Sequence, residues 1–370
     1  MRILHVSPST RRRIGGPSSL LRGLVPVQRD RGHQVTIVTT DQGAELDGDL
    51  AVPGADMRIV PAWGPIYIGA GKGLRKAVRD AVAEADVVHV HGVYSFAAVW
   101  AMREARAAGV PALVAPHGVW TEDHRPAHPT LSAAWDRLLL APTLKHAHTV
   151  VADSAREEDR IRDRGFAPTA VMVLGVDPAL HAIDTPWAER SGVLFLGRVA
   201  RKKRLDLTLE MYARSGLAAE GHRLVVAGPI EPTLPYDPRA MAADLGIAEH
   251  VDFLGTVDSE TRRDLLTRMR VFVLPSDDES FGMAAAEAAS AGMAVVASDR
   301  VAAMLEAERD GVAITSTQDP DALAEALRWA AADDGAGTAA ALCDYARERW
   351  TWEHAAQQVE DMVAGARASA

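Results

Sequence analysis

Residues 275–298, PSDDESFGMAAAEAASAGMAVVAS, contain the features that decide the fold. They follow a short apolar run at 271–274, and their own end, 294–297, is apolar again. Between these runs lie a polar loop at 275–280 and a segment rich in alanine and methionine at 281–291. This order predicts a strand, a loop, a helix and a second strand, which is a repeating unit of a parallel α/β sheet.

Two glutamates bracket the small-residue segment. Glu279 is expected in the loop before the helix, and Glu287 within the helix, leaning back toward Glu279 because helical side chains point toward the N-terminus. The free backbone N–H groups of Phe281, Gly282 and Met283 point to the same place. Carboxylates accept hydrogen bonds from hydroxyls, and a helix N-terminus attracts an anion. This combination suits a polyhydroxylated ligand that carries phosphate.

A glutamate on a helix is usually a solvated surface residue. Glu287, however, is the only charged residue between Glu279 and Asp299, and it is surrounded by alanines. Such a segment suits close packing, where a carboxylate needs a partner. We therefore expect Glu287 to face a partner or a ligand.

Length and composition narrow the class of protein. The chain has 370 residues, which predicts about two domains. It has 40 Lys and Arg against 50 Asp and Glu, a charge balance that disfavours a nucleic-acid partner. The single cysteine, Cys343, excludes an intrachain disulfide and favours a reducing cytoplasm. No apolar run is long enough for a signal peptide or a transmembrane segment, so we predict a cytoplasmic protein, with peripheral membrane contact left open.

The first half alternates short apolar runs with mostly helical segments, which is typical of a parallel sheet with helices on both faces. The expected strands are 2–7, 34–40, 57–60, 86–90, 112–115, 149–152 and 171–174. Gly15 and Gly16 precede a helix expected at 17–31 and would let a ligand approach the backbone, although a plain tight turn explains them equally well. The loop lacks the GxGxxG pattern, which disfavours a nicotinamide enzyme.

Histidines stand near two predicted strand ends, in VHVHG at 88–92 and in APHG at 115–118. Ligands of parallel sheets bind at the carboxyl ends of strands. His91 and His117, each followed by glycine, are therefore candidates to face a ligand, and His89 is expected to be a satisfied core residue. No group of His, Cys, Asp and Glu has the spacing of metal ligands, so no metal site is predicted.

Residues 177–191 lack periodicity and are the expected linker. The pattern then restarts, with strands expected at 192–196, 223–227, 251–254, 271–274, 294–297 and 312–315. The predicted fold is α/β, with two Rossmann-like doubly wound domains facing across a cleft. We expect an acceptor-binding domain at 1–180, a donor-binding domain at 181–350, and a C-terminal helix at 351–370 that can pack back on the first domain.

A basic loop, GRVARKKR at 197–204, follows the first strand of the second half. Arg198 directly follows a strand-end glycine, and Lys203 lies at the approach to a helix. Both are candidates to bind a pyrophosphate and to stabilise its charge as it leaves. For Arg201, Lys202 and Arg204, a solvated surface run is an equally good interpretation.

GRVARKKRLD at 197–206 together with ESFGMAAAE at 279–287 resembles the family-4 retaining glycosyltransferases of the GT-B fold. The signature of that family is E-x7-E after a strand, preceded by a GR…K phosphate loop. HVHG, APHG, VDFLG at 251–255 and TWEHAAQQVEDM at 351–362 agree with it, so the resemblance covers nearly the whole chain. The sequence departs from the family pattern at Leu174, where Asn is common, and at 300–305, where a Gly-Gly-Ile-Pro-Glu type segment is usual.

The resemblance implies roles for named residues. Those assigned to the donor are Gly15, Gly16, Arg198, Lys203, Phe253, Glu279, Phe281, Gly282, Met283 and Glu287, and those assigned to catalysis are Glu279, His117, Arg198 and Lys203. The arginine and lysine would bind the donor diphosphate. Glu279 would bind sugar hydroxyls and Glu287 the ribose, His117 would lie near the transferred sugar, and the strand of Phe253 would line the base.

The implied reaction moves a hexose-type sugar from a UDP- or GDP-sugar to a hydroxyl of a small-molecule or glycan acceptor, with retention. It would proceed by front-face attack, with no cofactor and no metal. Two other functions stay open at this point. One is a sugar-nucleotide epimerase or hydrolase on the same scaffold, and the other is a nucleotide-sugar binding protein without catalysis.

Overall fold

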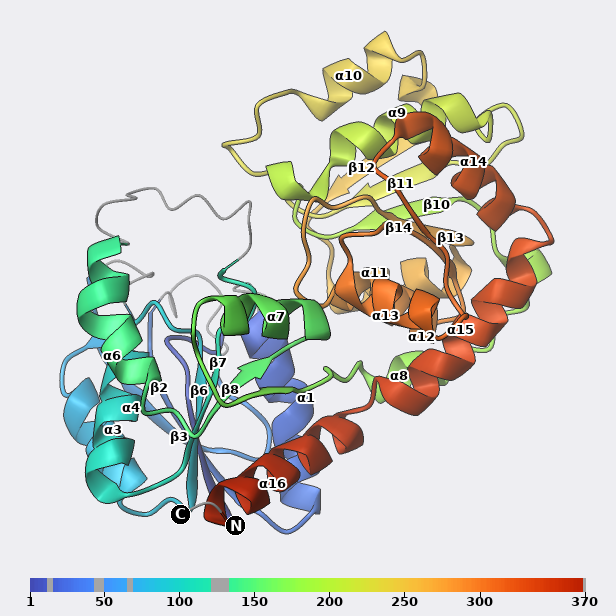
Figure 1. The fold of residues 1–370 in the computed structure, drawn as a ribbon. Helices are drawn as coiled ribbons and strands as arrows, with labels where there is room; N and C mark the ends of the chain where they lie inside the picture. Colours follow the sequence, from blue (N-terminus) through green and yellow to red (C-terminus); the bar gives the residue numbers. More distant parts are fainter. Residues whose placement is uncertain (12–15, 43–49, 65–68, 121–132, 369–370) are drawn as a thin grey trace. The chain divides into compact units, whose positions relative to one another are not determined.

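The computed structural model describes residues 1–11, 16–42, 50–64, 69–120 and 133–368. The chain divides into two compact units (Figure 1). Unit 1 consists of residues 1–175 and 352–370, and unit 2 of residues 176–351. The division thus falls a few residues before the linker position expected from the sequence.

Unit 1 is built on a seven-stranded parallel sheet with the order β3-β2-β1-β6-β7-β8-β9. Its strands are β1 Arg2–Val6, β2 Gln34–Thr40, β3 Asp56–Val60, β6 Val87–His91, β7 Ala112–Ala115, β8 Thr149–Ala152 and β9 Thr169–Val171, and a separate antiparallel pair is formed by β4 Ala62–Trp63 and β5 Ala70–Gly71. The strand order reverses between β1 and β6. In parallel sheets this is the place where a ligand site forms, at the carboxyl ends of the strands.

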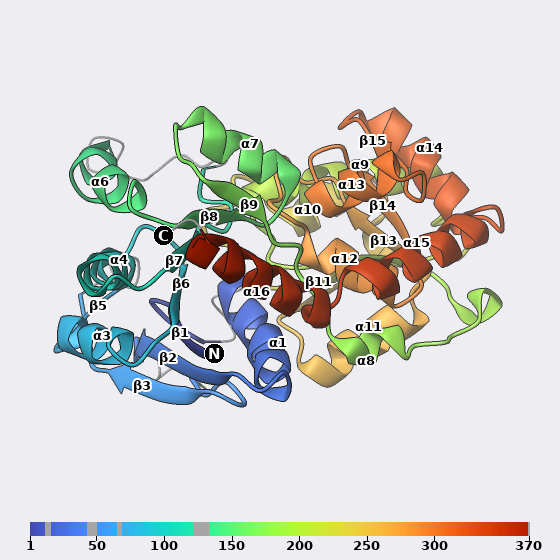
Figure 2. The same cartoon turned by 60° about the horizontal axis from the view of Figure 1, so that its bottom comes forward.

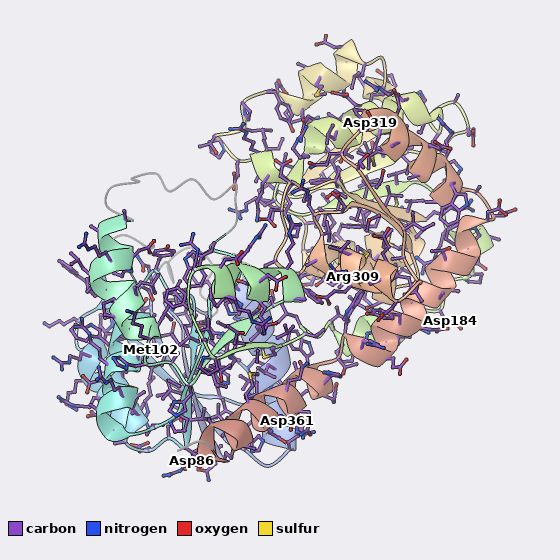
Figure 3. All side chains as sticks on the ribbon, viewed as in Figure 1. Asp86, Met102, Asp184, Arg309, Asp319 and Asp361 are labelled. Atoms are coloured by element: carbon purple, nitrogen blue, oxygen red, sulfur yellow. The ribbon has the colours of Figure 1, made fainter. Side chains whose placement is uncertain are left out.

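Helices cover both faces of this sheet (Figures 1 and 2). One face carries α3 Leu74–Val82, α4 Phe96–Ala108 and α7 Ala155–Asp163, and the other carries α1 Gly16–Asp30 and α16 Trp352–Ala368. The other helical segments in the described part of unit 1 are η3 Asp136–Leu140 and α6 Ala141–Leu144. Apolar side chains such as Met102 of α4, labelled in Figure 3, fill the space between helix and sheet.

Unit 2 repeats the architecture with a six-stranded parallel sheet in the order β12-β11-β10-β13-β14-β15. Its strands are β10 Val193–Leu196, β11 Leu224–Ala227, β12 Val251–Gly255, β13 Val271–Leu274, β14 Ala294–Ser298 and β15 Thr315–Ser316. Its helices are α8 Pro178–His181, η4 Trp187–Glu189, η5 Arg201–Lys203, α9 Leu205–Ser215, α10 Pro238–Asp244, η6 Ala248–His250, α11 Ser259–Arg268, α12 Met283–Ser290, α13 Ala302–Arg309, α14 Pro320–Ala331 and α15 Gly335–Arg349. Here the strand order reverses between β10 and β13.

Two strands lie elsewhere than the sequence pattern predicts. The run 171–174 was expected to be a strand, but β9 ends at Val171, because the backbone N–H of Val173 donates to Gln358 Oε1 of α16 at 2.9 Å instead of to the sheet. Residues 312–314 precede β15, since the Val312 N–H still donates to Ala307 O at the end of α13. Both differences concern edge strands, where a neighbouring helix competes for the backbone.

The helix that follows unit 2 along the chain, α16, packs against α1 of unit 1 (Figure 2). Trp352 is buried and occupies the space beside Gly23 of α1, where any Cβ would collide with the indole ring. At the far end of the contact, Arg31 donates to Glu360 at 2.7 Å, and His33 Nε2 lies 2.6 Å from the same carboxylate. In the described part of the chain, no helix combines the length and apolarity needed to cross a bilayer.

Candidate functional site

Lys203 and Glu279 form the closest pair among the predicted site residues. Lys203 lies in η5 after β10, and Glu279 lies in the loop after β13, so the two flank the reversal of strand order in unit 2. Lys203 Nζ is 2.5 Å from Glu279 Oε1, and both side chains are largely buried. Ser276 Oγ also donates to this oxygen at 3.1 Å. Burial opposes a charge on Glu279, but Lys203 and Lys202 outweigh it and lower the pKa of the carboxyl.

The loop that carries Glu279 is held by the residues after β14. The Glu279 N–H donates to Arg300 O at 3.1 Å, and Glu279 pairs with Val301 in an isolated parallel bridge. Gly282, the N-cap of α12, has a φ of 101° and would place a Cβ 2.5 Å from a methyl carbon of Val301. Residues 300 and 301, where the sequence departs from the family pattern, therefore shape this loop mainly through their backbone and one methyl group.

The start of α12 offers backbone donors. The N–H groups of Phe281, Gly282 and Met283 find no backbone acceptor in the described residues. The Phe281 ring itself is buried against Trp350, with the ring centroids 5.9 Å apart, so this side chain belongs to the core and only its backbone can serve a ligand.

The cations of the basic loop differ in their surroundings, since one is held in ion pairs and another is exposed. Arg204, in the left-handed region with φ 51°, pairs with Asp206 and Asp277 at 3.0 Å each, and Asp277 N–H donates to Lys202 O. These bonds tie the loop after β10 to the loop after β13. The surface interpretation of Arg204 is therefore wrong, whereas Arg201 is exposed.

Arg198 forms an ion pair with Glu231. Its guanidinium is more than half exposed and lies 2.8 Å from Glu231. A diphosphate could recruit Arg198 only in competition with this exposed pair, which costs little because such pairs contribute at most about 1 kcal/mol.

Glu287 has the partner that its alanine surroundings required. It forms an ion pair with Arg262 of α11, and its side chain is mostly buried. The identity of this cation could not be predicted from the sequence, because the two residues are far apart in the chain. Phe253 on β12 lies under Arg239, with the guanidinium carbon 4.7 Å from the ring centroid.

The described site residues of unit 1 lie near the reversal between β1 and β6. Gly16 begins α1, and Gly15 lies outside the described residues. His117 follows β7 with a left-handed φ of 58°, and its Nδ1 is 3.0 Å from Asp153 Oδ1. His91 is fully buried, so the expectation that it faces a ligand directly is wrong.

A hydrogen-bonded chain of imidazoles leads inward from His117. Its Nε2 is 3.1 Å from His91 Nδ1, and His91 Nε2 is 2.9 Å from His5 Nδ1. His5 Nε2 in turn is 2.9 Å from Gln28 Oε1 of α1. The sequence pattern did not indicate His5 and Gln28, because the direction of a single polar side chain in a strand or helix cannot be predicted from the pattern.

His89 was expected to be a satisfied core histidine, and this is wrong in part. It is fully buried, but neither ring nitrogen has a hydrogen-bond partner in the described part of the chain. His5, His89 and His91 offer nitrogens within 4.8 Å of one another. A metal would need the lone pairs that His5 and His91 use in their hydrogen bonds, so we assign none to this cluster.

Glu157 fixes the loop that carries His117. Its two carboxylate oxygens accept from the N–H of Gly118 at 2.6 Å and from the N–H of Asp153 at 2.8 Å. Burial, together with the negative charge of Asp153, raises the pKa of this carboxyl well above its usual range. The site in unit 1 is thus a buried, hydrogen-bonded network of titratable groups.

The segments that match known protein families correspond closely to the two units. Residues 14–180 match the family described as Glycosyltransferase Family 4, and residues 185–349 match Glycosyl transferases group 1. The chain is 30% identical to a phosphatidyl-myo-inositol mannosyltransferase of Mycolicibacterium smegmatis, over 90% of this chain and 86% of the relative. It is 27% identical to a GDP-mannose:cellobiosyl-diphosphopolyprenol alpha-mannosyltransferase of Xanthomonas oryzae pv. oryzae, over 81% and 79%.

Among solved structures, the fold is similar to that of Anabaena HepE in complex with UDP and glucose. The TM-score is 0.77 over 99% of this chain and 100% of HepE, at 19% identity. The similarity extends over both units and concerns the fold.

Proposed function

Since the chain belongs to the family-4 glycosyltransferases, which have the GT-B fold, we propose that it transfers a hexose-type sugar from a nucleotide diphosphate sugar to a hydroxyl group of an acceptor, with retention of anomeric configuration. The observation that carries this proposal is the contact between Lys203 and Glu279 beside the start of α12. It joins a cation suited to a diphosphate with an ionised carboxylate suited to sugar hydroxyls.

The pair supports a division of roles. Lys203 has three N–H donors, of which Glu279 uses one, so the others can bind phosphate oxygens. Glu279 retains lone pairs for sugar hydroxyls, and the backbone N–H groups at the start of α12 favour an anionic part of the ligand. Glu287 would hold the ribose while it stays paired with Arg262.

In the proposed reaction the bond between the anomeric carbon and the phosphate oxygen breaks, and its electron pair leaves with the diphosphate. The acceptor oxygen attacks from the same face, and its proton passes to the departing phosphate oxygen. Lys203 stabilises the charge that develops on that phosphate. No protein nucleophile is needed, and neither glutamate serves as one.

The donor is proposed as a UDP- or GDP-sugar. The Xanthomonas relative is named for GDP-mannose, and HepE was solved with UDP and glucose. These names describe the relatives themselves. They identify UDP-sugars and GDP-sugars as the first donors to test with this chain. We further propose that the reaction needs no metal, since a lysine and a helix N-terminus can stabilise the negative charge of the leaving diphosphate. We also propose that the reaction takes place in the cytoplasm.

The acceptor is proposed as a small polyhydroxylated molecule or a glycan. The two relatives are named for a phosphatidyl-inositol and for a diphosphopolyprenol-linked disaccharide. A free polyol and a lipid-linked one present the same hydroxyl chemistry, so an acceptor panel should contain both.

The test combines ligand binding with turnover. A matching nucleotide sugar should raise the melting temperature, because a ligand that binds the folded state stabilises it. With that donor, Glu279→Ala and Lys203→Ala should each lower turnover at least about tenfold, as expected for lost charge stabilisation, and chelation of divalent metals should leave the rate unchanged.

Arg201→Ala is the matched control, because it removes an exposed cation from the same loop. Near-normal turnover of both site variants, with an intact fold, would overturn the proposal. Donor hydrolysis or isomerisation at a competent rate without acceptor would point to a hydrolase or epimerase instead, and donor binding without turnover over the whole panel would point to a binding protein.

A further inference from the structure

Four side chains of unit 1 form one continuous buried path to Asp153. From Gln28 it passes through His5 and His91 to His117, with successive distances of 2.9, 2.9 and 3.1 Å, and it ends at the Asp153 carboxylate after a further 3.0 Å. Gln28, His5 and His91 are fully buried, and the His117 side chain is 8% exposed. Water therefore has little access to any of these ring nitrogens.

The sheet dictates this alignment. The strands β1, β6, β7 and β8 are successive neighbours, and parallel pairing brings their carboxyl ends to one edge. His5 and His91 lie at the ends of β1 and β6, His117 follows β7, and Asp153 follows β8. Each strand thus contributes one member of the path, and α1 contributes Gln28.

Both ring nitrogens of His117 are used inside this path. One faces Asp153 and the other faces His91. A ligand beside His117 therefore meets the charge of the ring rather than a free ring N–H, and the number of protons on this ring decides what the ligand experiences.

A neutral imidazole donates one hydrogen bond and accepts one, so every donation along the path must run in the same direction. Gln28 presents its carbonyl oxygen to His5, which makes His5 the donor there. His91 must then donate to His5, and His117 to His91. The other nitrogen of His117 faces a carboxylate, which can only accept, so it must carry a proton as well.

We propose that Gln28, His5 and His91 are positioning residues that hold His117 as an imidazolium, in a site whose role in sugar transfer rests on the proposed function. If the Gln28 amide is rotated so that its NH2 group donates to His5, every donation reverses. Each of the three imidazoles is then neutral, and the path holds one proton fewer. The orientation of one buried amide thus determines the charge of His117.

The surrounding charges agree with this assignment. The titratable groups that interact with His117 are Asp153, directly after β8, Glu157 of α7, and His89 and His91 of β6. Burial opposes a charge on His117, but the two carboxylates overcome it and raise its pKa. Burial lowers the pKa of His5 to about 4 and that of His91 well below the usual range, so the proton resides on His117.

The experiment is an NMR titration of the histidine ring nitrogens in the full-length protein without donor or acceptor, with the His117 signals assigned through a His117→Gln variant. In the wild type, His117 should titrate above the ordinary value of about 6.5. In Gln28→Met, which keeps the length of the side chain but removes the acceptor, the midpoint should fall by about one pH unit.

Gln28→Glu should move the midpoint in the opposite direction, because a carboxylate can only accept from His5. Gln34→Met, at an exposed position of the same unit, should leave it unchanged. Equal midpoints in the wild type and in folded Gln28→Met would overturn the proposal, as would a His117 that is already neutral at pH 6.5.

A rate measurement separates positioning from mere structural support. In Gln28→Met the alkaline limb of kcat/KM should shift to lower pH together with the NMR midpoint, whereas a structural defect would lower the rate equally at every pH. The titration itself uses no substrate, so it can fail or succeed independently of the proposed transferase activity.

Discussion

Lys203 and Glu279 depend on each other more than an ordinary surface pair does. Their side chains are 18% and 12% exposed, so removal of either one would leave the other as a nearly buried charge without its ion-pair partner. Removal of one partner from such a pair commonly costs about 3–5 kcal/mol. The same residues that we propose for donor binding thus also determine the stability of unit 2.

Lys203→Met should therefore lower the free energy of unfolding by about 3 kcal/mol. The double variant Lys203→Met/Glu279→Gln should lose much less than the sum of the single variants, with a coupling energy of about 1–3 kcal/mol. Urea denaturation of the four proteins measures it.

The exposed pair Arg214 and Asp321 in the same unit provides the control. The cycle of Arg214→Met and Asp321→Asn should give a coupling energy below about 1 kcal/mol. If the Lys203–Glu279 cycle gave no more than this control, the pair would not be acting as a desolvated unit.

At the scale of elements, the loops after β10 and β11 touch at two glycines. Gly228 has a φ of 147°, and a Cβ there would lie closer than 3.0 Å to the backbone oxygen of Gly197. The next residue, Arg198, is a proposed donor ligand, so this contact sets where its backbone runs. Because neither glycine has a side chain, the backbones at the two strand ends can approach each other this closely.

Gly228→Ala should destabilise the protein by about 3 kcal/mol, because it combines a strained φ with a collision against backbone that cannot move aside. Gly337→Ala is the matched control, since Gly337 lies within α15 and no atom would approach its Cβ within 4 Å. This control should stabilise the protein by about 0.5–1 kcal/mol. Thermal or urea unfolding compares the two, and a Gly228→Ala protein as stable as the wild type would show that the loops can separate freely.

At the scale of the whole molecule, buried imidazoles make stability depend on pH. Burial lowers the pKa of His5 to about 4 and that of His89 well below the usual range, so both are neutral in the folded protein and protonated in the unfolded chain below about pH 6.5. Their contribution is present above that pH and is lost as the pH falls toward the folded values.

His89→Leu should reduce this dependence. Below pH 6.5 the free energy of unfolding should fall less steeply with decreasing pH than it does in the wild type. The slope should be smaller by about 1.4 kcal/mol per pH unit, because the variant takes up one proton fewer on unfolding. At pH 7.5 the variant should be about as stable as the wild type or slightly more so, because it removes two nitrogens that have no partner in the described structure. Parallel slopes in the two proteins would mean that His89 is protonated in the folded state.

Pattern reading recovered most of the fold because strands buried on both faces are distinct in sequence. Three of the strands expected in unit 1 have the predicted bounds, Gln34–Thr40, Ala112–Ala115 and Thr149–Ala152. The edge strands β9 and β15 could not be placed in this way, because a side chain of α16 and a backbone carbonyl of α13 accept from N–H groups that the pattern assigned to the sheet.

The site was predictable in its residues but not in its partners. The spacing of Glu279 and Glu287 around a helix start is visible in the sequence, whereas Arg262 and Glu231 reach the site only through the fold. The path from Gln28 to Asp153 is the extreme case, since its five members lie in or directly after five different elements and no local pattern connects them. Sequence motifs therefore indicated the chemistry, and tertiary structure determined the charge states.

The packing of α16 on α1 also has a consequence for biosynthesis. Trp352 fills the space beside Gly23, yet it leaves the ribosome only after the whole of unit 2 has been made. Unit 2 is one continuous stretch of the chain and can fold as it emerges from the ribosome. Unit 1 cannot be completed until α16 has been translated, and until then the surface of α1 that contacts α16 stays uncovered. The half of the protein that is synthesised first is thus completed last, and a ribosome that stalls within residues 176–351 would leave an unfinished first unit exposed to chaperones and proteases.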